Sequence, residues 1–208
     1  MSETTLATPA SSAPLPRMSF EEFLEFGDGH TWAEWVDGEV TLLSTSTEHQ
    51  RLLRFLFLLL ALFVEARDLG EIFPPPFLMR LSERPSGREP DILFVTRENQ
   101  GRLQEKFLEG PADLVVEIIS PDNLRRDRVD KFHEYEQAGV REYWIIDAVN
   151  KGQEFFQLNA SGQYQSIAPD DQGRYHSAVL PGFWLDVTWL WQEPRLKVDD
   201  ARRAWGWV

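Results

Sequence analysis

The sequence predicts an α/β (α+β) fold in which a central mixed β-sheet is flanked by helices, and three observations lead to this prediction. Residues 114–119 and 142–147 are almost wholly apolar runs of strand length, separated by a segment with helical periodicity. Asp37-Gly38 lies between two β-prone runs, the strongest short-range signal of an antiparallel hairpin. Residues 52–64 are apolar around most of a helical circumference, which predicts a helix packed in the interior or at a subunit interface.

The length of 208 residues and the hydrophobic share of 42% fit one domain with a substantial core. We expect a disordered N-terminal tail over residues 1–17, the domain over residues 18–192 and a C-terminal tail over residues 193–208. The first tail is rich in Ser, Thr, Ala and Pro and does not have the pattern of a signal peptide. The last carries Trp205 and Trp207, which we expect to dock on the domain or on a partner.

Capping signals define the first two helices. Ser19 and Glu22 have the spacing of a capping box, which predicts a short helix near the start of the domain. Thr45 and Glu48 have the same spacing and predict the start of the long apolar helix, which runs to about Arg67.

Short strands are expected around these helices. The hairpin strands lie at residues 32–36 and 39–43, on either side of the Asp-Gly pair. Two further strands, at residues 70–73 and 77–81, flank a run of three prolines. Residues 82–88 contain Pro and Gly among polar residues, which predicts a loop.

The middle of the chain alternates strands and helices. Residues 91–95 are predicted to form a strand, and residues 98–108 a short helix. The apolar run at residues 114–119 is predicted to form the next strand. Residues 120–123 then supply turn and N-cap chemistry for a helix that ends at Gly139. The strand at 142–147 follows, and the order strand, helix, strand predicts a locally parallel pair.

The last elements are predicted to be peripheral. Residues 153–158 and 164–167 read as a hairpin around a turn that contains Asn, Ser and Gly. An extended segment at residues 180–185 and a short helix near residues 188–191 complete the domain.

The charge balance limits the partners that the protein can have. A net charge of −13 argues against tight non-specific binding of nucleic acid, which depends on Lys and Arg. Nucleic-acid binding would need a local basic patch, and the candidates are Arg125, Arg126, Arg128 and Lys131.

The composition also indicates the compartment. Cys is absent, which excludes disulfides and cysteinyl metal sites and is compatible with the cytoplasmic location that we expect. The apolar run at residues 52–64 is interrupted by Arg54 and is shorter than the ~20 residues of a membrane span. We therefore expect no membrane association.

Two carboxylates and one lysine on consecutive elements point to a metal site. Glu117 lies within a run that should be covered on both faces, where an unpaired charge is costly. Asp91, on a neighbouring strand, would repel it unless a cation or a proton lay between them. Lys131 lies in a partly apolar stripe of the following helix. The competing interpretation takes Asp91 as a strand-entry residue, Glu117 as the partner of an Arg, and Lys131 as a snorkelling lysine.

Other polar residues are candidates for accessory roles. Glu39 is a candidate metal or water ligand if its hairpin lies beside the site, and Asp127 could orient Lys131 from one helical turn away. We interpret Glu34 as a solvated strand charge, the common case for a carboxylate. His49, in the first turn of the long helix, is more often structural at such a position but is kept as a candidate.

Several motifs occur in a fixed order along the chain. They are Trp35-Val36-Asp37-Gly38-Glu39, His49-Gln50, Glu89-Pro90-Asp91, the segment 113–121, the segment 127–131, the segment 139–147 and Leu180-Pro181-Gly182. In this order they resemble the Uma2 family of restriction-endonuclease-like proteins, over roughly residues 19–191. The resemblance implies a restriction-endonuclease-like core of the PD-(D/E)XK nuclease superfamily.

The resemblance also implies roles for particular residues. In that superfamily an Asp and a Glu bind Mg²⁺, and a Lys positions or activates the attacking water; Asp91 and Glu117 match the two acids. The usual Lys, two residues after the second acid, is Ile119 here. Lys131 would therefore have to supply the ammonium from the next helix, which leaves the strength of catalysis open.

These observations predict an endonuclease that hydrolyses phosphodiester bonds of DNA with Mg²⁺, or alternatively Mn²⁺. The expected catalytic residues are Asp91, Glu117 and Lys131, with Asp91 and Glu117 as metal ligands. One alternative is a catalytically weak or inactive module that keeps the nuclease scaffold for binding or assembly. A homo-oligomer, a dimer or higher, is also expected, because the long helix is apolar and the charged tail carries Trp205 and Trp207.

Overall fold

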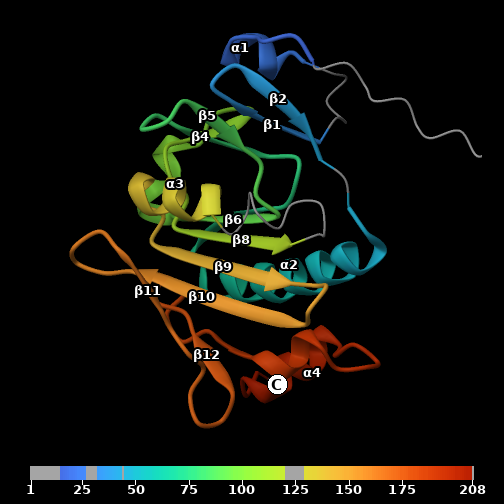
Figure 1. The fold of residues 1–208 in the computed structure, drawn as a ribbon. Coiled ribbons are helices and arrows are strands. Elements are labelled where there is room, and N and C mark those ends of the chain that lie inside the picture. The colour runs from blue at the N-terminus through green and yellow to red at the C-terminus, as the bar shows by residue number, and fades with distance from the viewer. Residues whose placement is uncertain (1–14, 27–31, 44, 120–128, 208) are drawn as a thin grey trace, which may run out of the picture.

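The computed structural model describes residues 15–26, 32–43, 45–119 and 129–207. The strands of the central sheet are β3 (Gly70–Phe73), β6 (Ile92–Thr96), β8 (Leu114–Ile119), β9 (Glu142–Asp147), β10 (Gly152–Leu158) and β11 (Tyr164–Ser166). They lie in the order β11-β10-β9-β8-β6-β3 across the sheet (Figure 1). The sheet is mixed, as predicted, because β8 and β9 run parallel whereas their other neighbours run antiparallel.

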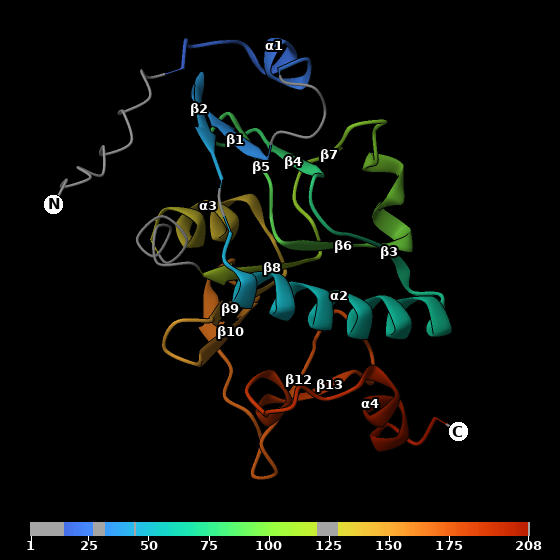
Figure 2. The same cartoon turned by 90° about the vertical axis from the view of Figure 1, so that its right-hand side faces the viewer.

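Helices cover both faces of this sheet. The long helix α2 (Thr47–Arg67) packs on the face to which Ile92 points, and α3 (Lys131–Ala138) packs on the face to which Leu93 points (Figure 2). Because side chains alternate along a strand, Asp91 belongs to the α3 face. The apolar character of α2 is thus explained by burial, and none of the described helices combines the length and apolarity that a membrane crossing needs.

A second sheet lies beside α3 and brings the N-terminal hairpin close to the central sheet (Figure 1). Its strands are β1 (Ala33–Val36), β2 (Glu39–Leu42), β4 (Leu78–Leu81), β5 (Ser86–Arg88) and β7 (Phe107–Glu109), in the order β2-β1-β5-β4-β7. The short helix α1 (Phe20–Leu24) closes it, with the ring of Phe20 5.6 Å from that of Trp35. Ser19 and Glu22 form the predicted capping box.

The C-terminal segment packs on α2. It contains β12 (Arg174–His176), β13 (Trp184–Asp186), the 3-10 helix η3 (Val187–Leu190) and α4 (Val198–Ala204). The rings of Trp205 and Trp207 each lie 5.3 Å from that of Phe63 on α2. The long helix and the Trp-rich tail, which led us to expect an oligomer, therefore contact each other within the chain, and the homo-oligomer stays a prediction.

Several predicted elements need correction. The N-cap of α2 is Ser46, whose Oγ accepts a hydrogen bond from the amide of His49, and not Thr45. The predicted loop at residues 82–88 ends in strand β5, because its last three residues pair with both β1 and β4. The predicted helix at residues 98–108 is the 3-10 helix η1 (Arg97–Arg102) followed by strand β7.

Candidate active site

Asp91 and Glu117 lie side by side on the α3 face of the central sheet. In the antiparallel pair of β6 and β8, Ile92 lies opposite Val116, so the same register continued by one residue sets Asp91 opposite Glu117. Side chains of directly opposed residues lie on one face, with Cβ atoms ~4.5–5.5 Å apart. The amide of Ile118 donates a hydrogen bond to Asp91 Oδ2 at 2.6 Å. The structure therefore brings the two predicted acids together.

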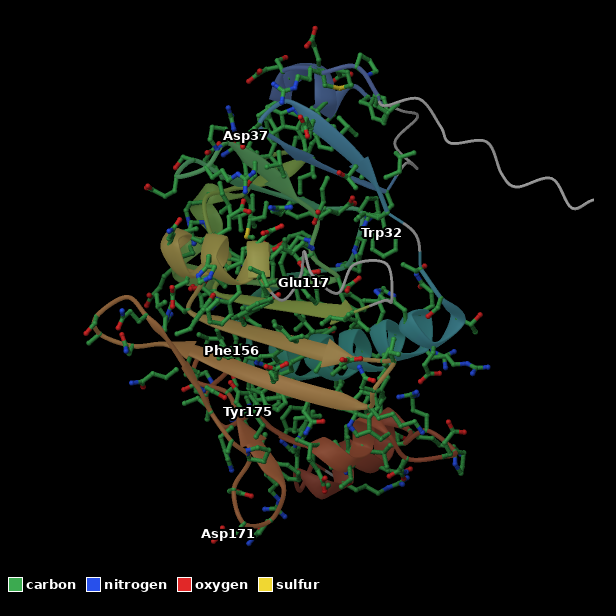
Figure 3. The ribbon with its side chains drawn as sticks, viewed as in Figure 1. Trp32, Asp37, Glu117, Phe156, Asp171 and Tyr175 are labelled. Atoms are coloured by element: carbon green, nitrogen blue, oxygen red, sulfur yellow. The ribbon has the colours of Figure 1, made fainter. Side chains whose placement is uncertain are left out.

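Lys131 joins this pair from the start of α3. Its Nζ lies 2.8 Å from Glu117 Oε1 and 2.8 Å from Glu34 Oε1. Tyr135, one helical turn later, donates its hydroxyl to the same Glu117 Oε1 at 2.8 Å. All four side chains are buried, and Glu117 lies between α3 and the central sheet (Figure 3). Burial first, and then the neighbouring Glu117 and Glu34, raise the pKa of Tyr135 well above its ordinary value, which keeps its hydroxyl a donor.

The interpretation of Glu34 as a solvated charge is wrong, because its side chain is only 1% exposed. Its Oε2 accepts from Arg88 Nη1 at 3.2 Å, and Arg88 Nε donates to Glu134 Oε2 at 3.0 Å. Burial alone would lower the pKa of Arg88, but Glu34 and Glu134 raise it above its ordinary value. Alternating charges thus run from Glu117 through Lys131, Glu34 and Arg88 to Glu134. We call these five residues the ion chain.

His49 contacts Asp91 from the first turn of α2. Its Nε2 lies 3.0 Å from Asp91 Oδ1, and both side chains are buried. Its other ring nitrogen, Nδ1, is also buried and has no hydrogen-bond partner among the residues that the structure describes. The ring packs edge-on against Trp32, with centroids 5.9 Å apart. The structure therefore brings this candidate residue to the acid pair, where it holds one carboxylate in place.

Glu89 is a further buried acid that the sequence analysis did not single out. Its Oε2 accepts from the amide of Ala33 at 2.9 Å, which ties the chain before β6 to β1. Burial raises the pKa of Glu89 to about 8; the Ala33 amide and Lys131 oppose this shift, and Glu34 and Asp91 add to it. The motif Glu89-Pro90-Asp91 thus places one acid on each side of a proline, both next to the ion chain.

The pKa of Glu89 predicts a pH-dependent stability in metal-free protein. A carboxyl whose pKa is raised on folding binds its proton more tightly in the folded state, so stability falls as the pH rises from about 5 to about 8. The loss is at most about 1.4 kcal/mol per pH unit in this window. Urea unfolding in EDTA should show this slope in the natural protein and a shallower one in Glu89→Gln, in which Glu142, whose pKa is also raised by burial, still contributes. Equal slopes in the two proteins would contradict the prediction.

The other candidate residues do not join this cluster in the described structure. The prediction of Glu39 as an accessory ligand is wrong, because its carboxylate is 67% exposed on the hairpin and pairs with Arg17 at 2.5 Å. In β1 and β2 the residue that faces the cluster is Glu34 instead. The remaining candidates, which lie outside the described residues, are Asp127, Arg125, Arg126 and Arg128.

The donor set at Asp91 and Glu117 fits a hard divalent cation. Within the described residues no group of three or more His, Cys, Asp or Glu side chains is arranged to hold a metal ion. Mg²⁺ does not need such a group, because it keeps several waters and usually takes one or two carboxylates. Asp91 uses one lone pair on each oxygen for its contacts with His49 and Ile118, so each oxygen keeps a lone pair for a further ligand.

Known proteins resemble this chain in sequence and in fold. The family model Uma2, described as "Putative restriction endonuclease", matches residues 20–188. The uncharacterised protein slr1290 of Synechocystis sp. (strain ATCC 27184 / PCC 6803 / Kazusa) is 25% identical over 157 residues, which are 74% of this chain and 80% of that relative.

One solved structure has a similar fold. It is described as "a putative nuclease belonging to DUF820" from Anabaena variabilis ATCC 29413, and the TM-score is 0.69. The similarity covers 83% of this chain and 97% of that chain, at 14% sequence identity. At this identity the match shows the fold, an α/β arrangement of mixed sheets flanked by helices, and the assignment of roles depends on the residues themselves.

Proposed function

The chain belongs to the Uma2 family, and from this premise we propose that it is a Mg²⁺-dependent endonuclease that hydrolyses phosphodiester bonds of DNA. The observation that carries the proposal is the meeting of Asp91, Glu117 and Lys131 on one face of the central sheet. These residues come from three elements that are far apart in the sequence. A lysine that only balances Glu117 and Glu34 does not account for Asp91, which lies directly opposite Glu117 on the neighbouring strand.

Asp91 and Glu117 would hold the metal ion in this proposal. When bound, Mg²⁺ neutralises phosphate charge and lowers the pKa of the attacking water. His49 fixes the orientation of Asp91, and the hydroxyl of Tyr135 fixes that of Glu117. The ammonium of Lys131, 2.8 Å from Glu117, places a positive charge where negative charge develops during hydrolysis.

Lys131 takes the place of the lysine that the superfamily pattern puts at position 119. Ile119 is fully buried in the apolar cluster that also contains Tyr135 and Val115. An ammonium there would have to replace an apolar side chain of this cluster, which is costly. Lys131 instead reaches Glu117 from α3, which covers the same face, so the buried ammonium is paired with the carboxylates of Glu117 and Glu34.

Metal-dependent cleavage of DNA tests the proposal. The purified full-length chain is incubated with supercoiled plasmid and with labelled duplex and single-stranded oligonucleotides, in Mg²⁺, in Mn²⁺ and in EDTA. We expect cleavage with either metal ion and none in EDTA. Cleavage that continues in EDTA would contradict metal dependence, and intact substrates under all conditions would contradict the nuclease.

The deep burial of the cluster favours a second candidate function, a nuclease-fold module without catalysis. Asp91, Glu117 and Lys131 are each less than 5% exposed, and Lys131 lies between two carboxylates. Such an arrangement is also typical of a structural ion network. Calorimetric titration with Mg²⁺ and Mn²⁺ separates the candidates, because a nuclease must bind the metal ion whereas a module of this kind need not.

A further inference from the structure

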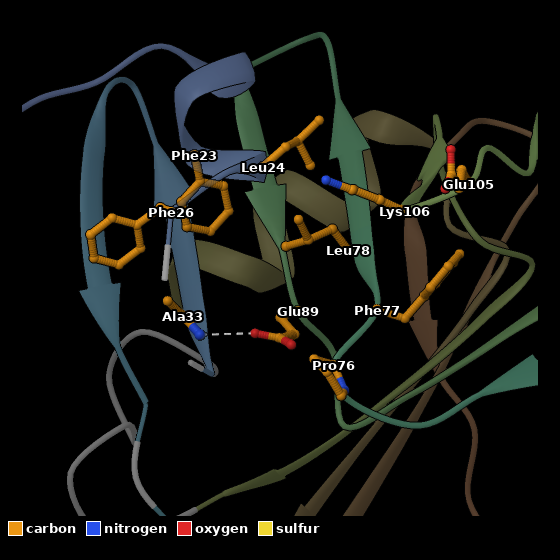
Figure 4. Close-up of a pocket in the computed structure, with 10 residues that line it drawn as sticks. All are labelled: Phe23, Leu24, Phe26, Ala33, Pro76, Phe77, Leu78, Glu89, Glu105 and Lys106. Atoms are coloured by element: carbon orange, nitrogen blue, oxygen red, sulfur yellow. Dashed lines mark hydrogen bonds between the residues drawn. The ribbon is translucent and has the colours of Figure 1, made fainter. Parts of the chain in front are cut away.

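A pocket of about 240 Å³ lies next to the candidate active site, between α1, β1 and the chain before β4 (Figure 4). It is smaller than the ~300–1,000 Å³ of pockets for drug-sized ligands, so its volume suits a single ring system. Its lining is mostly apolar and aromatic: Phe23, Leu24, Phe26, Ala33, Pro76, Phe77, Leu78, Glu89, Glu105 and Lys106.

The aromatic walls of the pocket are held by their own stacking partners. Phe26 stacks with Phe23, at an interplanar angle of 20°. Phe77 stacks with Phe73, with centroids 4.3 Å apart. Figure 4 draws Phe26 and Phe77 on opposite sides of the pocket. Rings fixed in this way lose little conformational freedom when a flat ligand enters, and they offer the faces on which a planar heterocycle stacks.

Glu89 supplies the polar group of the pocket. Its side chain is only 3% exposed, and Oε2 is already used by the amide of Ala33. Oε1 has no hydrogen-bond partner in the part of the chain that the structure describes. A buried carboxyl group with one unused oxygen, at the wall of an aromatic pocket, is suited to a ligand whose edge carries a donor beside an acceptor.

We propose that this pocket binds one nucleobase of the substrate strand, taken out of the stack, with its amino edge toward Glu89. The inference rests on the proposed nuclease function and names the substrate feature that the protein reads. Among the bases, cytosine fits best, because its single ring suits the volume and its N4 amino donor lies beside the N3 acceptor, so this edge can pair with the carboxyl group of Glu89 in either protonation state. An extruded base is typically held by stacking between aromatic and apolar side chains and by hydrogen bonds to its Watson–Crick edge.

The position of Glu89 links the pocket to the candidate active site. Only Pro90 separates it from Asp91, and Pro restricts the backbone of this segment. A base held at Glu89 therefore fixes the position of the strand relative to the acid pair. Lys106, at the rim, pairs with Glu25 at 2.6 Å on the surface, a contact that is weak enough to be exchanged for a phosphate.

Binding of short single strands tests this inference without catalysis. The full-length protein in EDTA is titrated calorimetrically with six-nucleotide oligomers of dC, dA and dT. We expect the tightest binding for the dC oligomer. Phe26→Ala removes one of the rings on which the base stacks, and it should weaken binding of the dC oligomer about tenfold or more. Leu78→Trp, which fills the pocket rather than leaving a void, should have a similar effect. Glu89→Leu, which removes the polar group of the pocket, should reduce the preference for dC.

A matched control and a second assay make the test decisive. Phe57→Ala removes a phenylalanine that is also partly buried but belongs to α2 and packs against the core cluster there, and this variant should bind dC like the natural protein. Equal affinity for the three oligomers overturns the inference. So does a loss of dC affinity in Phe57→Ala that equals the loss in Phe26→Ala. Preferred dC binding without cleavage in Mg²⁺ would contradict only the nuclease, whereas cleavage without preferred dC binding would contradict only the base pocket.

Discussion

Asp91→Asn is expected to reduce Mg²⁺-dependent cleavage by about three orders of magnitude or more, because loss of one metal ligand removes several kcal/mol of transition-state stabilisation. The change keeps the shape of the side chain. The amide oxygen can still accept from the Ile118 amide, and the amide nitrogen can donate to an unprotonated Nε2 of His49. The fold should therefore survive while the negative charge is lost. A plasmid nicking assay measures the rate, and calorimetry measures the affinity for Mg²⁺.

Glu39→Gln is the matched control for this prediction. It also removes one carboxylate charge, but from an exposed side chain on the hairpin. Its cleavage rate and Mg²⁺ affinity should equal those of the natural protein. If Asp91→Asn cleaves DNA as fast as Glu39→Gln while both proteins unfold at the same temperature, Asp91 has no part in the reaction.

The middle strands of the central sheet and the hairpin of the second sheet could be predicted from local patterns. The apolar runs of β8 and β9 can be recognised because strands covered on both faces carry few polar residues, and the Asp37-Gly38 pair identifies the hairpin. Strand β5 could not be predicted, since Ser86 and Gly87 have low strand propensity and are ordered by pairing on both sides. Its conformation depends on partners that are distant in the sequence.

The site could be predicted only in part, and Glu34 illustrates why. In β1 it alternates with Ala33 and Trp35, which pack under α1. Such a pattern normally places the polar residue in water. Here the other face of the hairpin is covered by Lys131 and Arg88, so a carboxylate is buried by pairing. Whether a second face is covered is a property of the tertiary fold, which a local pattern does not contain.

Arg88→Met is expected to destabilise the folded protein by about 3–5 kcal/mol, because it leaves two carboxylates buried without their common cation. Arg88 is 3% exposed and lies between Glu34 and Glu134, which are equally buried. Met keeps most of the apolar volume of the side chain, so the loss measures the charge and its hydrogen bonds. Unfolding in urea, followed by tryptophan fluorescence, gives the free energy of unfolding.

Arg84→Met separates this burial effect from the general loss of an arginine. Arg84 pairs with Asp37 at 2.9 Å, but both side chains are about half exposed, and such a pair contributes about 1 kcal/mol or less. Adding Glu134→Gln to Arg88→Met should restore part of the stability, since one buried charge is then removed. If Arg88→Met costs no more than Arg84→Met, the ion chain does not hold Glu34 and Lys131 in place, and the geometry of the candidate site must depend on other contacts.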